Sequence, residues 1–260
     1  MTAISGAPAR VEIGSVATRT LGAIGRNWIN FGALALVFSA LPQFLFQWQL
    51  LQIRGGATGA WGLSFLAVLL VLVATFLLQG ALTYGAVADL NGRRPSIAEC
   101  LSNGLGAVVP LLGLSIVMGL ALICGFLLLI VPGVLMALAW IVAVPSLVVE
   151  RKGVFGSLSR SADLTRNHRG SIFLIGVVFW VLSVIVGVVV GVVVGLVFGL
   201  GVGALGFANT PALQIVQAVV AALANAAEAM VGAVGVAAIY YELRSIKEGI
   251  GPQALASVFD

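Results

Sequence analysis

The sequence predicts an all-α integral membrane protein that crosses the membrane six times, as three helical hairpins. Apolar residues make up 61% of its 260 residues, charged residues make up 8%, and the mean hydropathy is +1.17. A typical soluble domain has about 25% charged residues. Two stretches, 100–149 and 170–227, contain no charged residue at all. Each is long enough for two crossings of about 20 residues, so each predicts more than one transmembrane helix.

The positions of the basic residues predict the orientation. Of the 13 lysines and arginines, all but Arg54 lie in alternate gaps between apolar segments. Because cytoplasmic loops carry an excess of Lys and Arg, this distribution places both termini in the cytoplasm. The basic residues flank apolar segments and form no single patch, so we expect no nucleic-acid partner. The residues on the cytoplasmic side are Arg10, Arg19, Arg26, Arg93, Arg94, Arg151, Lys152, Arg160, Arg166, Arg169, Arg244 and Lys247.

Six apolar segments are predicted to form the transmembrane helices. The fourth is the shortest, and its roughly 17 residues would span only about 25 Å, less than the hydrocarbon core of about 30 Å. The segments are 28–51, 59–88, 105–130, 133–149, 171–200 and 212–240.

The third and fourth segments are predicted to form a tight hairpin, because only Val131, Pro132 and Gly133 join them. Pro132 suits the first turn of the following helix, and Gly133 relieves crowding at the turn. Pro145 is expected to kink the fourth helix.

Three segments with helical periodicity, 11–26, 96–105 and 154–167, precede the first, third and fifth apolar segments. We expect them to be amphipathic helices at the cytoplasmic membrane surface, with the apolar face toward the membrane and the basic face toward anionic head groups. The alternative is that they are extensions of the transmembrane helices. An acidic residue followed by a basic one ends each even-numbered segment, at 89–93, 150–151 and 242–244, which favours a design of three similar units.

The chain divides into a cytoplasmic amphipathic segment (1–27), a six-helix membrane domain (28–241) and a cytoplasmic C-terminal tail (242–260). The first segment lacks the apolar core and cleavage site of a signal peptide, so we expect it to remain in the mature protein. Cys100 is expected at the cytoplasmic interface and Cys124 inside an apolar helix, which argues against a structural disulfide. Thiol reagents outside intact cells should therefore not label Cys100.

Glycines recur every four residues in the fifth apolar segment and form a glycine zipper. Helix backbones approach closely along such a stripe. We expect the stripe to pack within the subunit, against alanines that repeat at the same interval in the sixth segment; a contact between two copies of the chain, or a sliding surface, is the alternative. The glycines are Gly187, Gly191, Gly195, Gly199 and Gly203, and the alanines are Ala218, Ala222 and Ala226.

Glu228 is the only ionisable residue well inside a predicted span. Because a carboxylate is costly in hydrocarbon, it is expected to be protonated, paired or facing a polar cavity. Other polar side chains are expected to join it in a polar interior, which serves either helix packing or a substrate or proton pathway. Glu228→Gln separates these readings, because loss of activity with unchanged stability favours the pathway. The other residues are Asn225, Gln79, Thr75, Thr83, Gln43 and Gln47.

No motif in the sequence indicates catalysis. His168 is the only histidine and lies in a basic segment, which argues against a histidine metal site or a Ser-His dyad in the membrane. The sequence has no His-Glu-x-x-His helix, phosphate loop or Gly-x-Ser-x-Gly elbow. An enzyme acting on lipid head groups would have to use Glu150, Asp163, Ser157 and Ser161. We expect no enzymatic activity, metal or cofactor.

The region 131–165 resembles the signature region of the YciC-like family of multi-spanning bacterial membrane proteins. It is also similar to the membrane domain fused to some glycerophosphoryl diester phosphodiesterases. The resemblance implies a six-helix protein of the bacterial inner membrane, and it does not imply phosphodiesterase activity, because the catalytic barrel and its metal-binding carboxylates are absent. Residues 240–244 show a second, weaker similarity to the same family. The resemblance is carried by Pro132, Gly133, Trp140, Pro145, Glu150, Gly153, Ser157, Leu158, Arg160, Ser161 and Leu164.

Two functional hypotheses follow. The first is a non-enzymatic protein that organises lipid or a membrane protein partner in envelope maintenance, with the bilayer, anionic head groups or a second copy of the chain as partners. The second is a transporter or permease-like protein with a polar interior around Glu228. A water-accessible cavity at Glu228 would favour transport. The first uses an interfacial head-group site of Glu150, Arg151, Lys152, Arg160 and Arg166, near the backbone carbonyl that Pro145 frees; alternatively, nothing binds there.

Overall fold

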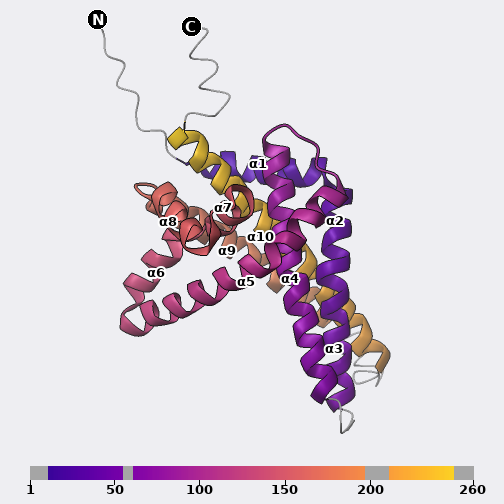
Figure 1. The fold of residues 1–260 in the computed structure, drawn as a ribbon. Coiled ribbons are helices and arrows are strands. Elements are labelled where there is room, and N and C mark those ends of the chain that lie inside the picture. Colours follow the sequence, from indigo (N-terminus) through magenta and orange to yellow (C-terminus); the bar gives the residue numbers. More distant parts are fainter. Residues whose placement is uncertain (1–10, 55–60, 197–210, 249–260) are drawn as a thin grey trace, which may run out of the picture.

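The computed structural model describes residues 11–54, 61–196 and 211–248, and every regular element in these ranges is a helix (Figure 1). Six of its helical segments are long and apolar enough to cross a membrane. The predicted fold class, an all-α polytopic membrane protein, is thus confirmed.

The first span follows the amphipathic helix α1 (Ile13–Arg26) and consists of α2 (Trp28–Ala35), a π-helical turn η1 (Leu36–Ala40) and α3 (Leu41–Arg54). Pro42 has no N–H for the preceding turn, and it lies directly after the π-helical turn. The second span is α4 (Trp61–Leu90) and the third is α5 (Ile97–Leu128). The later elements are α6 (Ile130–Ala139), α7 (Ala143–Glu150), α8 (Gly153–Thr165), α9 (Arg169–Val194) and α10 (Pro211–Glu248).

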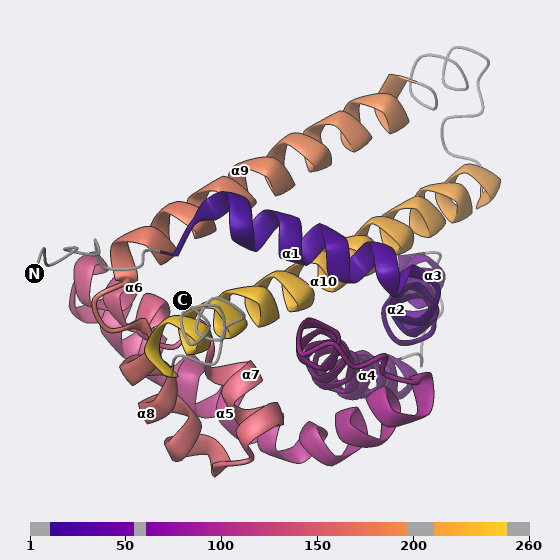
Figure 2. The same ribbon diagram turned by 90° about the horizontal axis from the view of Figure 1, so that it is seen from above.

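Helices α3, α4 and α10 run side by side, and the α5–α6 hairpin extends away from them (Figure 1). The view from above shows α1 lying along α10, and α9 running apart from α10 (Figure 2). The largest core cluster joins α1, α2, α4 and α10 around the buried side chains of Phe31, Leu82, Tyr240 and Leu243. The protein is therefore packed most closely around α4 and α10.

The three predicted amphipathic segments differ in structure, because two form separate helices and one is part of a longer helix. Segments 11–26 and 154–167 form the separate helices α1 and α8, as predicted. Segment 96–105 is the first part of α5, so for this segment the alternative, an extension of a transmembrane helix, is the correct one. A capping box between Ser96 and Glu99 starts the long helix there.

The apolar faces of α1 and α8 pack on the protein. Val16 of α1 and Leu158 and Leu164 of α8 are buried in the two core clusters. The expectation that these faces rest on the membrane is therefore wrong for Val16, Leu158 and Leu164, whereas Leu21 and Phe155 of the same predicted faces are exposed. Both helices cover the ends of the transmembrane helices.

The fourth span is broken into α6 and α7 at residues 140–142, just before Pro145. Pro145 lies in the first turn of α7 and has no N–H to continue a helix from α6, which explains the predicted kink. The carbonyl of Ala139 at the end of α6 accepts hydrogen bonds from Ser161 (2.8 Å) and Thr165 (3.3 Å) of α8. These side chains replace the helical donors that the break removes.

The tight hairpin between α5 and α6 is confirmed. Only Leu129 separates the two helices, and Pro132 lies in the first turn of α6. A Cβ atom on Gly133 would come within 2.6 Å of the Phe126 ring, and one on Gly125 would lie 3.2 Å from the Gly133 Cα. Glycine at both positions allows the close approach of the two helices.

The glycine zipper has no partner within the described chain, so the prediction that it packs inside the subunit is wrong. A Cβ atom added to Gly187, Gly191 or Gly195 would meet nothing within 4 Å. Only Ile172 and Ile175 of α9 are buried, and both precede the zipper. Gly199 and Gly203 lie outside the described residues. The alanine stripe is buried, but it packs with the core around η1, α3 and α4.

Candidate functional site

One end of the helix bundle gathers the charged residues. The first span begins there, and α4, α7 and α10 end there, because α1 contacts the ends of α4 and α10 and Glu150 of α7 bonds Tyr240 of α10. We call this end the basic face. Every ion pair among the described residues lies on it. Three acidic residues, one at the end of each even-numbered span, form four of these seven pairs.

Asp89 at the end of α4 holds the end of α1. Its side chain is 5% exposed and lies 2.5 Å from Nη2 of Arg26. Nδ2 of Asn27 donates to the same carboxylate at 2.7 Å. The hydrogen bond with Asp89 raises the pKa of Arg26. Together these contacts fix the junction between α1 and the first span against the second span.

Glu242 near the end of α10 holds the middle of α1. Its carboxylate lies 3.0 Å from Nε of Arg19, in an ion pair whose N–H is not aligned as a hydrogen bond. Ser15 donates to the other carboxylate oxygen at 3.1 Å. The guanidinium of Arg19 also lies 5.1 Å from the centre of the Tyr241 ring, which is a cation–π distance. Helix α1 is therefore attached to the second and the last span.

Glu150 at the end of α7 has the most partners. Its side chain is 10% exposed and contacts Nε of Arg160 at 2.9 Å, Nζ of Lys152 at 2.8 Å and the hydroxyl of Tyr240 at 2.8 Å. A carboxylate with this many donors is satisfied without any ligand. The contacts join α7, α8 and α10.

Glu248 extends this group on α10. It pairs with Arg160 and, at 2.6 Å, with Arg244 one turn earlier. Burial lowers the pKa of Arg160, but the hydrogen bonds to Glu248 and Glu150 outweigh it and the pKa is raised. The amino group of Lys247 donates to the backbone carbonyl of Asp163. The end of α10 is thereby fixed against α8.

The predicted head-group site is divided by these contacts. Glu150 pairs with the partly buried Arg160 and with the exposed Lys152, so these three side chains are engaged with one another and do not form the open head-group site that was predicted. Arg166 is exposed, with no ion pair or hydrogen bond among the described residues. Arg151 is exposed and bonds only the side chain of Asn103 on α5, at 2.9 Å. Of the five predicted residues, Arg151 and Arg166 are those whose charge is free of a carboxylate.

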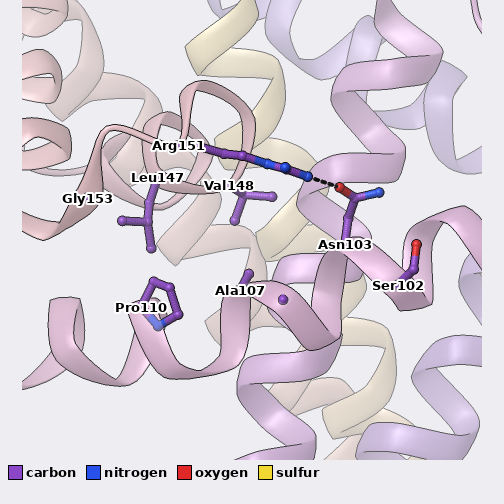
Figure 3. A pocket seen from close by; sticks show the side chains of 9 residues that line it. Ser102, Asn103, Ala107, Pro110, Leu147, Val148, Arg151 and Gly153 are labelled. Carbon is purple, nitrogen blue, oxygen red and sulfur yellow. Dashed lines mark hydrogen bonds between the residues drawn. The ribbon is translucent and has the colours of Figure 1, made fainter.

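Arg151 lies at the mouth of a pocket of about 290 Å³ between α5 and the junction of α7 and α8. Figure 3 shows its side chain reaching across to Asn103. Leu147 and Val148 form one wall and Ala107 and Pro110 form another (Figure 3). The lining also includes Ser102, Gly106 and Gly153. The pocket thus combines one arginine, two polar side chains and an apolar surface.

The predicted polar interior around Glu228 does not form. Glu228 and Asn225 are exposed on α10, and Asn225 donates to the carbonyl of Ala221 in its own helix. Thr75 is exposed and bonds the carbonyl of Val71, whereas Thr83 is buried. Gln79, Gln43 and Gln47 are partly buried. Glu228 lies on a face of α10 opposite the buried alanine Ala226, so it points away from these side chains.

The two serines considered for catalysis are buried, whereas Asp163 is exposed on α8. Ser157 and Ser161 are fully buried, and their hydroxyls donate to the carbonyls of Gly153 and Ala139. The described residues contain no group of three or more His, Cys, Asp or Glu side chains arranged to hold a metal ion. Both hydroxyls are therefore engaged in hydrogen bonds to the backbone.

No protein-family model matches the chain, and the searches found no similar curated protein or solved structure.

Sequence reasoning missed Asp89, Glu242 and Tyr240 as members of the site. The acids were visible as the last charged residues of the even-numbered spans, but their partners on α1 are far away in the sequence. It also missed Asn103 and Pro110, whose spacing of seven residues places both on one face of a helix. The signal that could have indicated the pocket is an arginine directly after a helix end, combined with a second helix that carries Asn103 and Pro110 on one face.

Proposed function

We propose that the protein is a non-enzymatic protein of the bacterial inner membrane, with its basic face in the cytoplasm, that organises anionic phospholipid in envelope maintenance. We also propose that it belongs with the YciC-like proteins that its region 131–165 resembles. The proposal rests on the basic face.

The supporting observation is that three carboxylates, those of Asp89, Glu150 and Glu242, attach α1 and α8 to the ends of the spans. Arginines that pair internally hold the two helices in fixed positions. Arg94, Arg151 and Arg166 have no carboxylate partner among the described residues and are exposed on the same face. A rigid face with unpaired cations attracts anionic head groups at about 1 kcal/mol per residue near the surface.

Exposed apolar side chains also lie on the helices of this face. Leu21 on α1, Trp28 at the start of the first span and Phe155 on α8 are 67%, 67% and 74% exposed. Trp at the end of a span is typical of the membrane interface, and amphipathic helices insert such side chains at the boundary of head groups and acyl chains. Basic and apolar side chains together suit a membrane surface better than a soluble partner.

No observation favours the transport hypothesis. Glu228 faces outward from α10, and the pocket described above lies at the basic face. The arrangement that would have supported transport, a cavity at Glu228, is not among the described features.

Orientation is tested with an engineered cysteine. Cys100 is fully buried, so its resistance to labelling would carry no information about topology. Ser159 is exposed on α8 and Cys124 is exposed on α5. In Ser159→Cys with Cys124→Ser, we expect an impermeant thiol reagent to label the protein only after the cells are opened. Labelling of intact cells would reverse the proposed orientation.

Lipid organisation is tested by thermal unfolding in detergent with added phosphatidylglycerol or phosphatidylcholine. We expect the anionic lipid to raise the unfolding temperature more than the zwitterionic lipid. The variant Arg94→Gln with Arg166→Gln should reduce this difference without changing the unfolding temperature in detergent alone, because neither side chain has a partner among the described residues. Arg94→Lys with Arg166→Lys keeps the charge and is the control. Equal stabilisation of the wild type by both lipids would contradict the proposal.

A further inference from the structure

The pocket beside Arg151 is built by local features of α5 and α7. Asn103, Gly106, Ala107 and Pro110 follow the i, i+3, i+4, i+7 spacing of one helix face, and all four line the pocket. Pro110 lies inside α5 and has no N–H, so the carbonyl of Gly106 lacks its usual helical donor. Because Gly106 lines the pocket, we assign this carbonyl as its acceptor.

The position of Arg151 is fixed by its backbone. It ends α7 in the left-handed conformation, with φ of 52°, and its N–H bonds the carbonyl of Leu147. This conformation is disfavoured by roughly 1–2 kcal/mol for a residue with a Cβ atom, and glycine is the usual residue there. An arginine at this place is therefore a reason to look for a role of its side chain.

The charge of Arg151 is not compensated. The adjacent carboxylate, Glu150, is occupied by Arg160, Lys152 and Tyr240. Arg151 bonds a neutral amide oxygen, which uses one of its five N–H donors. The remaining donors form a planar fork suited to two oxygens of a phosphate. The pocket therefore favours an anion with paired oxygens.

The other groups in the pocket suit a lipid better than a free anion. Ala107, Pro110, Leu147 and Val148 offer apolar surface, and Gly106 offers an acceptor for a hydroxyl donor. A volume of about 290 Å³ lies at the lower end of ligand pockets, enough for a head group and not for acyl chains. Helix α5 has 32 residues. At 1.5 Å per residue it is about 48 Å long, so its first turns extend beyond a hydrocarbon core of about 30 Å into the head-group layer.

We infer that this pocket binds the phosphodiester of an anionic phospholipid whose head group carries hydroxyl donors, with Arg151 on the phosphate and the carbonyl of Gly106 accepting from the head group. The inference deepens the proposed function and rests on it, because it names one lipid site on the basic face. Phosphatidylglycerol has the required chemistry.

The test measures binding of short-chain phosphatidylglycerol to the full-length protein in detergent by native mass spectrometry and by calorimetry. We expect Arg151→Gly to weaken this binding at least tenfold, on the order expected when hydrogen bonds to a charged group are lost. Glycine suits the left-handed backbone, so the variant should fold as well as the wild type. Asn167→Gly is the matched control, because Asn167 is the other non-glycine residue with positive φ among the described residues and is exposed on the same face. Its affinity should stay close to that of the wild type.

Pro110→Ala provides a second test that does not touch the charge. It restores a helical donor for the carbonyl of Gly106, so we expect the preference for phosphatidylglycerol over phosphatidic acid, which lacks the glycerol hydroxyls, to fall. Unchanged binding of phosphatidylglycerol to Arg151→Gly would overturn the inference while leaving the proposed function intact. Inorganic phosphate that competes at equal concentration would overturn the assignment to a lipid. No preference of the wild type for any anionic lipid would overturn both.

Discussion

Two regions of the molecule contain the same kinds of residue in opposite surroundings. Where α4 crosses α5, a Cβ atom on Gly104 would lie 2.7 Å from the backbone oxygen of Leu77, whereas one on Gly191 of α9 would meet nothing within 4 Å. Likewise Glu150 of α7 is surrounded by donors, and Glu228 of α10 is exposed. Glycine spacing shows that two helices can pack closely, and a lone carboxylate shows that an ion pair can form. Whether the contact exists depends on which segment of the fold lies opposite.

The largest effect is expected from Gly104→Ala. The new methyl group would collide with the backbone of α4, which cannot turn aside as a side chain does, so we expect a loss of stability of about 1–3 kcal/mol or more. The unfolding temperature in detergent measures it. Gly106→Ala is the matched control, because it lies on the same helix and a Cβ atom there would meet nothing within 4 Å. Helix propensity alone favours alanine at both positions, so a loss at Gly104 no larger than that at Gly106 would mean that the crossing does not determine the effect.

The next effect is expected from Glu150→Gln. It removes the charge that Arg160 and Lys152 share and leaves both cations less well paired, at a cost of about 1–3 kcal/mol. Glu228→Gln makes the same chemical change where the side chain has no partner among the described residues, and we expect no loss there. Thermal unfolding of both variants gives the comparison. A larger loss for Glu228→Gln would show that this side chain has a partner outside the described chain.

A smaller effect is expected from Gly191→Ala. The position is open, so the stability of the single chain should change by no more than about 0.5 kcal/mol. The same variant tests the remaining alternative for the glycine zipper, a contact between copies. Analytical ultracentrifugation in detergent should give the same mass as for the wild type if α9 faces lipid, and a lower mass if the zipper joins two copies.

The smallest effect concerns pH. Burial, with the nearby charge of Lys247, lowers the pKa of His168 below its usual 6.5. The unfolded chain therefore binds a proton at higher pH than the folded chain, so stability is highest above pH 6.5 and falls as the pH drops below it. We expect the unfolding temperature to fall less between pH 7 and pH 5 in His168→Gln than in the wild type. An identical pH dependence in both would exclude His168 as a contributor.

The sequence was sufficient to predict an element where polar and apolar residues distinguish one side of that element from the other. The spans, the α5–α6 hairpin and helices α1 and α8 were predicted because apolar length, Pro132 with Gly133, and helical periodicity are local signals. The directions of α9 and α10 were not predictable, since a helix that is apolar or small on every side does not show which side contacts protein and which contacts lipid. Glu228 was therefore placed inside the bundle when it faces outward.

Only part of the candidate site was predictable, because its remaining features depend on contacts between residues far apart in the sequence. Arg151 was identified from its place at the end of a span, but its freedom depends on Glu150 being occupied by Arg160 and Tyr240, which are 10 and 90 residues away. Such long-range pairing leaves no local pattern. The pocket likewise needs α5 and α7 together.

The attachment of α1 has a consequence for how the chain is made. The hydrogen bond between Ser15 and Glu242 joins residues 227 positions apart, so this attachment of α1 forms only after α10 has been made, whereas the contacts of Arg26 and Asn27 with Asp89 need only α4. Contacts of such separation form late in folding. Until α10 is inserted, α1 exposes the apolar face that it later buries, and a chain that stops before Glu242 would display it permanently. A docked α1 therefore distinguishes a chain that includes α10 from one truncated before Glu242.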